Sequence, residues 1–584
     1  MQAKNARTRI ICALIAATLS ISCLSSCSQI NISDDSQVTT PPSGSGTQPS
    51  TAALTDATDN VPAFTVTHAD ETKPSTASPD TDPEPESTAV PGTDGGVNTN
   101  PPVSSHPISE STYETNENGE IIDDYTSDLV FDTEDPDELY SMFGLSRSER
   151  QQFYNEISSK YELPIIHIST ENEQEVLSKE NYVNCLVEIF NCEDEYVMDA
   201  TSAGIRVRGN ASAFYGDEDQ IRENGAPYRI KFTKKQSVLG LNDSAKCKSW
   251  VLLRTYEAGV RDHLAFKLAK AINNGDYFSS DSRFVELYLN EKFMGLYLLC
   301  EQSQENPNRV AINECDEGYT GTDIGYLVEL DNYSYDEEWR FMLNYNKESI
   351  TDVYGTTRTP ISYYYTVKND IYSDEQLKFI ERYFEVAYEI PMRAIKYGEF
   401  YRLNDDMTLT LAQDEFESAY DCVSQVLNID SFVDMYLTHE ITNNQDVGGG
   451  SFYFAVDFGS ISLYKTLTCV CPWDFSWSYA DYSSDSDGGL YAAKFKDSYF
   501  VENYGDRSNP WLILLYSADW FQQLVKEKWT ERYPYIIEAL EDVRNTVDTY
   551  SADFNLSESR RTGRAKAIIN WVSDRCEYLN ELWG

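Results

Sequence analysis

The stretch Ile205-Arg-Val-Arg-Gly-Asn-Ala-Ser212, followed by Pro227-Tyr-Arg-Ile-Lys-Phe232, decides the fold of this chain. Both segments alternate between apolar and basic residues, which is typical of β-strands. In the second strand the alternation places Ile230 on one face and Arg229 and Lys231 on the other. If this basic face points into a cleft, it can bind a phosphate ligand. The alternative interpretation is that the basic face is exposed to water and binds nothing.

Further strands surround this pair, and helices dominate afterwards. Alternating or β-branched runs predict strands of a mainly antiparallel sheet at 164–170, 185–190, 283–290 and 293–300. Apolar stripes predict helices over about 136–160 and 257–274, and beyond Glu301 over about 374–397, 411–426, 430–442, 517–549 and 557–582, with a short hairpin within 452–470. We therefore expect an α+β protein in which a β-rich lobe with one helix precedes a helix-rich lobe.

The charge of the chain excludes one large class of partners. The 584 residues include 46 Lys and Arg and 96 Asp and Glu, for a formal net charge of −50. Nucleic-acid binding requires basic side chains that neutralise phosphates, so this chain is not expected to bind nucleic acid. The same charge argues against electrostatic docking on an anionic membrane. The high negative charge is explained by solubility, or by a preference for basic protein substrates.

The N-terminus has the pattern of an export signal. A basic start precedes an apolar run at 10–21, which is too short to span a bilayer, and Leu24-Ser25-Ser26-Cys27 follows. The pattern is similar to a bacterial lipobox, which predicts a signal peptide over 1–27 and lipidation of Cys27 at the outer face of the membrane. A plain secretory signal with a chance cysteine is the alternative.

Composition divides the rest of the chain. Residues 28–125 are rich in Ser, Thr, Pro, Asp and Gly, which predicts a disordered linker. A helical extension is expected over 126–162, the β-rich lobe over 163–305 and the helix-rich lobe over 306–584. Nine cysteines lie in the expected folded part without a CxxC pair, so they are interpreted mostly as buried apolar residues, with one or two disulfides open.

Six short motifs in order resemble the CotH family of spore-coat and surface kinases. They are the two opening segments, Trp250-Val-Leu-Leu253, Arg261-Asp-His-Leu-Ala-Phe-Lys-Leu-Ala269, Phe284-Val-Glu-Leu-Tyr-Leu-Asn290 and Gly295-Leu-Tyr-Leu-Leu-Cys-Glu301, and the match resumes at Asn444-Gln-Asp446, Ser451-Phe-Tyr-Phe454 and Pro472-Trp-Asp474. The resemblance implies a two-lobed atypical protein-kinase-like fold. It also implies an extracellular enzyme that transfers phosphate from ATP to Ser or Thr of surface or secreted proteins.

The resemblance implies a catalytic and metal-binding set in the second lobe. Asp446 matches the catalytic aspartate that accepts the proton of the substrate hydroxyl. Asp474 matches the aspartate that binds Mg²⁺ or Mn²⁺, with Asn444 as a further ligand. The chain has Ser451 and Ser476 where the family usually has Asn and a second Asp, which puts the second metal site in doubt.

The resemblance implies an ATP site in the first lobe. Arg208, Gly209, Asn210 and Ser212 form a turn that could offer an Arg and backbone N–H groups to phosphates, and an ordinary turn is the alternative. Lys231 resembles the nucleotide-binding lysine of the third kinase strand.

Three further residues complete that predicted site. Arg261 is expected to bind phosphate or an acid that bridges the lobes, and Glu301 to lie at the hinge beside the adenine. Glu257 is the nearest acid that could brace the lysine, and a helix cap is its alternative role.

Two other function classes are weighed. The serines at 451 and 476 favour a pseudokinase or a structural surface module. Paired carboxylates would permit a glycosidase, although no motif orders them. His167, His263 and His439 lie without a neighbouring Ser or Cys in sequence, which gives no support to a catalytic triad. The sequence contains no Walker A loop, HExxH or GxGxxG motif.

Overall fold

The computed structural model describes residues 133–254, 260–331, 333–460, 462–479, 486–556 and 561–584, with the backbone of the short pair β1 (Glu114–Thr115) and β2 (Ile121–Ile122). These residues belong to one compact unit, Thr99–Gly584. The predicted signal peptide with Cys27 lies outside the described residues, as does the predicted linker apart from β1 and β2. No helix in the described ranges is both long and apolar enough to cross a bilayer.

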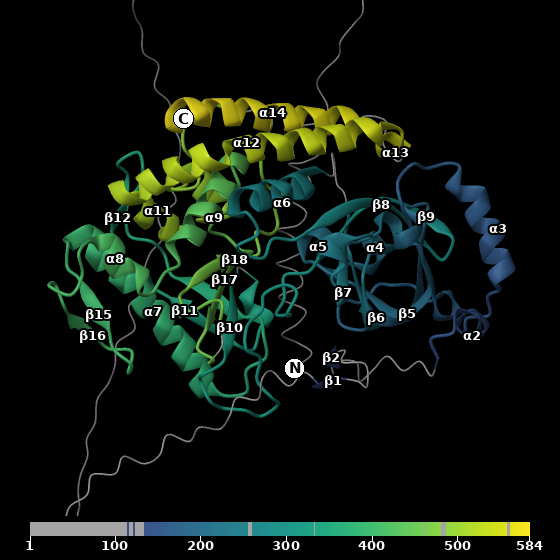
Figure 1. The fold of residues 1–584 in the computed structure, drawn as a ribbon, viewed down its shortest axis with the longest axis horizontal. Helices are drawn as coiled ribbons and strands as arrows, with labels where there is room; N and C mark the ends of the chain where they lie inside the picture. The colour runs from purple at the N-terminus through teal and green to yellow at the C-terminus, as the bar shows by residue number, and fades with distance from the viewer. Residues whose placement is uncertain are drawn as a thin grey trace, which may run out of the picture. The chain divides into compact units, whose positions relative to one another are not determined.

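A closed barrel forms the first half of the unit (Figure 1). Its strands follow the order β3-β4-β5-β6-β7-β9-β8, and all neighbours are antiparallel except β3 and β8, which are parallel. The bounds are β3 Ile165–Thr170, β4 Val183–Phe190, β5 Met198–Val207, β6 Tyr228–Gln236, β7 Cys247–Arg254, β8 Ser282–Leu289 and β9 Lys292–Glu301. The mainly antiparallel pairing agrees with the sequence, whereas closure through β3 and β8 was not predicted.

Small helical segments decorate the barrel. The predicted helix at 136–160 is two helices, α2 (Pro136–Met142) and α3 (Arg147–Ser158), because Gly144 has φ of +67° and Ser146 caps the second helix. Both helices pack on the barrel, where the Tyr140 hydroxyl donates to Glu188. The short helices α4 (Glu218–Asn224) and α5 (Leu241–Ser244) connect barrel strands.

The second half of the unit contains an antiparallel sheet that the sequence reading missed. Its strand order is β11-β14-β10-β17-β18. The bounds are β10 Gly325–Leu330, β11 Arg340–Leu343, β14 Tyr363–Val367, β17 Phe452–Asp457 and β18 Thr468–Val470, with small hairpins β12 (Ile350–Thr351) with β13 (Thr357–Arg358) and β15 (Tyr401–Leu403) with β16 (Leu409–Leu411). The predicted hairpin β17–β18 is therefore one edge of a larger sheet.

Helices surround this sheet. They are α7 Asp374–Tyr397, α8 Ala419–Ser424, α9 Ile429–Thr442, α10 Ser498–Tyr504, α11 Pro510–Tyr516, α12 Asp519–Thr549, α13 Ser551–Leu556 and α14 Arg561–Trp583. Four of them (α7, α9, α12 and α14) follow predicted ranges. The helix expected over 411–426 was wrong for most of its length, because only α8 is helical there. Figure 1 shows α12 and α14 running side by side along one edge of the unit.

Helix α6 (Val260–Asn273) joins the two halves. The sequence assigns it to the β-rich lobe, but its main packing partners are α12 and α9 (Figure 1). Its apolar residues Val260, Leu264 and Leu268 are buried in the same hydrophobic core as the second-half sheet. A separate core fills the barrel. Helix α6 therefore places its polar first turn where the barrel meets the helical half.

The nine cysteines in the described residues are all unpaired, and seven of them are buried. The interpretation as buried apolar residues is confirmed, and the option of one or two disulfides is not realised among them.

Candidate functional site

The loop after α9 presents Asp446. Asn443 ends the helix in the left-handed region with φ of 44°, and the Asn444 side chain then organises the turn. Asn444 Oδ1 accepts the Asp446 backbone N–H at 3.0 Å, and its Nδ2 lies 3.2 Å from Nδ1 of His439. Burial lowers the pKa of His439 to about 3, so this ring is neutral. The turn fixes the direction in which the Asp446 side chain leaves the backbone.

The glycines after Asp446 are required by close packing. A Cβ atom on Gly448 would overlap the backbone of Ser508, and one on Gly449 would overlap Asp446 Oδ1 and the Arg507 guanidinium. This space allows Arg507 Nη1 to form an ion pair with Asp446 Oδ1. The run of glycines thus permits a carboxylate–guanidinium contact, a role that the sequence pattern alone did not reveal.

A second loop, after β18, presents Asp474. The backbone of Asp474 has φ of 58°, and its side chain is exposed. Ser476, which stands where relatives often have a second Asp, donates its hydroxyl to Asp474 Oδ1 at 2.8 Å. The serine therefore orients the carboxylate without adding a charge.

The structure brings the two loops together. Burial raises the pKa of Asp446, Arg507 opposes this effect, and the negative charge of Asp474 adds to it. Two carboxylates from segments that are 28 positions apart in sequence (446 and 474) therefore share one electrostatic environment. Helix α9 positions the first and strand β18 the second.

A third aspartate, Asp262, completes this acidic group. Asp262 lies in the first turn of α6, and its Oδ1 accepts the backbone N–H of Phe475 at 2.8 Å. Burial raises its pKa to about 7, Asp474 adds to this shift, and Arg208 and Arg261 oppose it. The sequence did carry a signal for this residue, because it directly follows Arg261 in the quoted motif.

Arg261 lies beside the loop that carries Asp474. The Arg261 guanidinium donates to the backbone carbonyls of Ser476, at 3.3 Å, and Ser478, so it supports the loop that carries Asp474. The Tyr479 hydroxyl returns a hydrogen bond to the Arg261 carbonyl at 3.2 Å. Glu257 lies outside the described residues.

The turn after β5 reaches the same region. The Arg208 guanidinium lies 5.5 Å from the ring centroid of Trp473, the residue before Asp474. Gly209 has φ of +90°, and a Cβ atom there would overlap the Ser212 hydroxyl. The tight turn therefore requires glycine at this position. Asn210 Oδ1 accepts a hydrogen bond from Lys179.

The tip of this turn continues toward Asp446. Burial raises the pKa of Tyr333, its interactions with Tyr215 at the tip add to this shift, and Arg507 lowers it while Asp446 raises it. Tyr333 therefore interacts both with the turn of the barrel and with the Asp446–Arg507 pair. These contacts link the predicted phosphate turn to the predicted catalytic loop.

Lys231 lies on the outer face of the barrel. Its neighbour Ile230 points into the barrel core, and Lys231 pairs with Ser249 on β7. Residues directly opposite share a face, and Val251, two residues after Ser249, packs into the core of the helical half. Lys231 therefore lies on the face that meets this half, while its role as a nucleotide ligand stays a prediction.

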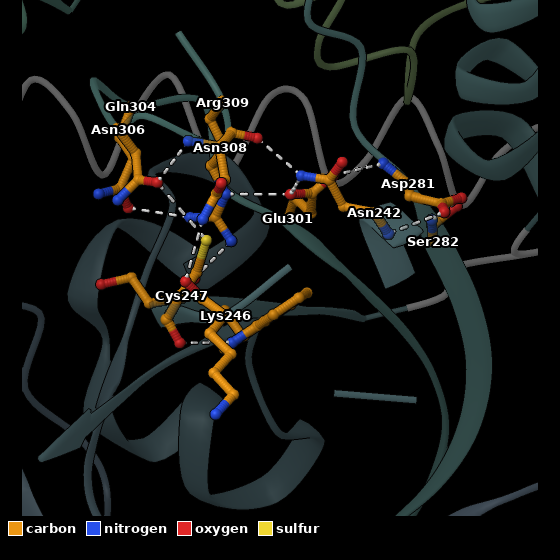
Figure 2. Close-up of polar contacts among 12 residues, drawn as sticks. Asn242, Lys246, Cys247, Asp281, Ser282, Glu301, Gln304, Asn306, Asn308 and Arg309 are labelled. Atoms are coloured by element: carbon orange, nitrogen blue, oxygen red, sulfur yellow. Dashed lines mark hydrogen bonds and ion pairs between the residues drawn. The ribbon is translucent and has the colours of Figure 1, made fainter. Parts of the chain in front are cut away.

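Glu301 ends β9 and is buried. Its side chain is 1% exposed, and Figure 2 shows it among Asn242, Asp281 and Arg309. Its carboxylate accepts from Asn242 Nδ2 at 2.9 Å, from Arg309 Nε at 3.2 Å and from the backbone N–H of Asp281 at 3.1 Å. This carboxylate forms an internal ion pair with Arg309 at the end of β9, and its place beside the adenine stays a prediction.

Lys496 is a charged residue near Asp446 that no sequence motif indicated. It lies between β18 and α10, is 2% exposed, and Nζ has no hydrogen-bond partner in the described part of the chain. Burial lowers its pKa to about 7, Lys494 adds to the shift, and Asp446 is the first of the acids that oppose it. The sequence could not have indicated this residue, because only the tertiary structure shows that the lysine is buried.

The oxygen ligands fit a hard divalent cation that is also bound by phosphates. Within the described ranges, no three His, Cys, Asp or Glu side chains are grouped to hold a metal ion. Mg²⁺ typically takes one or two carboxylates and completes its shell with phosphate and water. The exposed Asp474 carboxylate, close to Asp446 and Asp262, suits this mode. Asn444 suits it less, because its oxygen already accepts the Asp446 N–H.

Fold and site together define an α+β protein with a closed barrel, a helix-rich half, and a charged site of three aspartates faced by arginines. The family model described as CotH kinase protein matches residues 205–579. The chain therefore belongs to the CotH kinase family, as its motifs predicted. A search of curated proteins gave no significant match.

Proposed function

We propose that this protein is an ATP-dependent kinase that phosphorylates Ser or Thr of surface or secreted proteins. The observation that carries the proposal is the convergence of the loops of Asp446 and Asp474. The backbone N–H of Gln445 donates to the Trp477 carbonyl at 3.3 Å, and Arg507, which pairs with Asp446, lies over the Trp477 ring. Membership of the CotH kinase family supports the same reaction class. Phosphoryl transfer requires positioning and charge stabilisation more than covalent chemistry from the protein.

The two halves of the unit correspond in this proposal to the lobes of an atypical kinase-like fold. The barrel with Arg208, Gly209, Asn210 and Ser212 is the N-lobe, and its tight turn faces the phosphates of ATP. Lys231, on the barrel face that meets the helical half, contacts the α- and β-phosphates. The adenine is proposed to lie near the end of β9, where the Glu301 side chain supports the strand end.

Asp474 is the proposed ligand of Mg²⁺ or Mn²⁺, with Ser476 holding its carboxylate and Arg261 holding the loop. The ion, when bound with ATP, would neutralise phosphate charge during transfer. Asp262 holds the loop that carries Asp474 in place, because its carboxylate accepts the Phe475 N–H at 2.8 Å. A bound cation would offset the negative charge of the three aspartates.

Asp446 is the proposed base that accepts the proton of the acceptor hydroxyl. The Arg507 guanidinium keeps part of its charge compensated, and it also lies 5.2 Å from the Trp477 ring centroid in the loop after Asp474. Arg507 thus connects the proposed catalytic loop to the proposed metal loop.

The direct test uses purified protein, γ-labelled ATP, Mg²⁺ or Mn²⁺, and candidate surface proteins, with phosphosites located by mass spectrometry. Asp446→Asn and Asp474→Asn should each lower turnover by ~10² or more while the unfolding midpoint stays close to wild type. Exposed Asp497→Asn, at the cap of α10, is the control and should keep activity. Transfer by Asp446→Asn at the wild-type rate would refute the catalytic assignment.

A catalytically weak pseudokinase is the second candidate, and one contact favours it. The Arg507 ion pair occupies an oxygen of Asp446, and serines replace family residues at 451 and 476. Thermal shift with ATP and Mg²⁺ separates binding from turnover, since a ligand stabilises the state that binds it. A shift without transfer would establish the pseudokinase, and neither effect would leave a structural surface module.

The proposal includes the place of action. Lipidation of Cys27 would anchor the chain at the outer face of the cell membrane, with residues 28–125 as the spacer. Globomycin, which blocks lipoprotein signal cleavage, should then retain the precursor in cells. If the inhibitor leaves cleavage of the signal peptide unchanged, the plain secretory signal is favoured.

A further inference from the structure

Two arginines lie directly opposite each other on the outer face of the barrel. Arg206 on β5 is the register partner of Arg229 on β6. The adjacent residues Ile205 and Ile230 are in the barrel core, so both guanidinium groups leave the sheet on the face that also carries Lys231. Directly opposite residues have Cβ atoms about 5 Å apart, and like charges at such positions repel each other.

The protein supplies only part of the hydrogen bonding that these two guanidinium groups require. Arg206 Nη1 donates to the Lys179 carbonyl, and the guanidinium carbon lies 5.2 Å from the ring centroid of Tyr182. Arg229 Nη2 donates to the Ser249 hydroxyl at 3.2 Å. In both arginines Nε is buried and has no hydrogen-bond partner among the described residues. A buried donor without an acceptor costs free energy, so the pair requires a further acceptor.

Positive charge accumulates on this face of the barrel. Burial lowers the pKa of Arg229, and the positive charges of Arg206 and Arg208 add to this shift. Tyr182 and Glu305 oppose it. Burial also raises the pKa of Glu305 to about 8, so this carboxyl gives little compensating charge at neutral pH. A protein with a formal net charge of −50 therefore gathers arginines where few carboxylates balance them.

The same face leads to the proposed nucleotide site. Lys231 follows Arg229 by two residues on β6, and the side chains of alternate residues in a strand share a face. Arg208 follows Arg206 by two residues, directly after β5. The Arg208 guanidinium lies 5.5 Å from the ring centroid of Trp473, in the loop that carries the proposed metal ligand. The arginine pair therefore lies beside the residues proposed to contact the phosphates of ATP.

We propose that Arg206 and Arg229 form an oxyanion site that holds a phosphate group of the bound nucleotide between their guanidinium groups. The inference rests on the proposed function and extends the phosphate-binding set beyond Lys231 and the turn at 208–212. A guanidinium presents its N–H donors in a planar fork that fits phosphate oxygens, and such hydrogen bonds are charge-assisted. The anion provides the acceptors that both Nε atoms lack and offsets the repulsion between the strands.

The test measures binding, so it does not depend on turnover. Isothermal titration calorimetry of the purified protein with Mg²⁺ and either ATP or tripolyphosphate gives a dissociation constant for each ligand. Arg229→Gln should raise both constants by about 10–100-fold, because the variant loses a charge-assisted contact with phosphate. Arg283→Gln is the matched control and should change neither constant. Arg283 is a half-buried arginine of the same barrel, but it pairs with Glu193 at 2.9 Å.

Two further variants separate the charge from the fold. Arg206→Gln should weaken binding of both ligands as Arg229→Gln does, because one anion accepts from both residues. Arg229→Lys keeps the positive charge and should bind tripolyphosphate more tightly than Arg229→Gln does. Without ligand, both Gln variants should unfold at or above the wild-type temperature, since each removes one of two opposed charges.

The outcomes distinguish this site from the proposed reaction. Wild-type affinity of Arg229→Gln for both ligands would overturn the inference, and so would an equal loss in Arg283→Gln, which would make overall charge the cause. Weaker binding of tripolyphosphate but not of ATP would overturn the assignment to the nucleotide. If Arg229→Gln loses both ligands while the wild-type protein binds them but transfers no phosphate, the oxyanion site stands and the kinase reaction is refuted. Absence of binding by the wild-type protein would refute both.

Discussion

Replacing Lys496, a buried lysine whose Nζ has no hydrogen-bond partner among the described residues, by Met should make the protein more stable. Met keeps a similar length of apolar side chain but carries no charge. The pKa of Lys496 is lowered from 10.5 to about 7, chiefly by burial. Each pKa unit corresponds to about 1.4 kcal/mol, so the charged form of this lysine costs the folded state up to about 5 kcal/mol below pH 7.

The sign of the pH dependence follows from proton binding. Between pH 7 and pH 10.5 the unfolded chain holds the Lys496 proton more fully than the folded chain, so wild-type stability rises with pH through this window. The penalty is complete below the folded pKa and disappears as the pH approaches the unfolded pKa. The gain from Lys496→Met should therefore fall from about 5 kcal/mol at pH 6 to about 2 kcal/mol at pH 9.

Urea unfolding at pH 6, 7.5 and 9 measures this gain as a rise in the denaturation midpoint with an unchanged m-value. Lys526→Met on α12 is the control, because Lys526 is exposed and its replacement should change stability by less than about 0.5 kcal/mol. A lower stability of Lys496→Met at pH 6, or a gain that does not shrink toward pH 9, would refute the reasoning that the ammonium is buried without sufficient partners.

Three other outcomes test the same structure. Gly449→Ala should lower stability by about 1–3 kcal/mol and break the ion pair of Asp446, because the added Cβ has no space. Gly563→Ala on α14 is the control and should be neutral, because the space around it is open. Urea unfolding measures the stability of both variants, and the kinase assay measures their activity. Glu301→Gln should cost about 3–5 kcal/mol of unfolding free energy, because it leaves a buried Arg unpaired, and calorimetry measures the loss. Stabilisation by ATP with Mg²⁺ should disappear with EDTA or in Asp474→Asn, and a shift that survives both would contradict the proposed metal ligand.

Elements with strong local signals were predicted well from the sequence. Helix α7 matches its predicted range of 374–397, since Ser373 caps its start and Gly398 adopts the left-handed conformation at its end. On β6, strict alternation correctly separated Ile230, in the barrel core, from Lys231, outside it. In both cases the periodicity of one segment contains the required information.

Elements that depend on distant partners were missed. Strand β10 pairs with β17 across more than 120 positions of the chain and with β14 across more than 30, and the patterns of these strands are short. The parallel closure between β3 and β8 is equally non-local. Pairing of this kind depends on the whole barrel or sheet, so a single run of residues does not predict it.

The sequence by itself determined the family, most strands of the barrel, the long helices, and the identities of Asp446 and Asp474 as the residues to follow. Only the tertiary structure decided that Arg507 pairs with Asp446 and that Glu301 is held internally by Arg309. It also decided that Lys496 is enclosed beside an acid. The physical reason is that periodicity is a property of neighbours along the chain, whereas desolvation and Coulomb interaction depend on distances that exist only after folding.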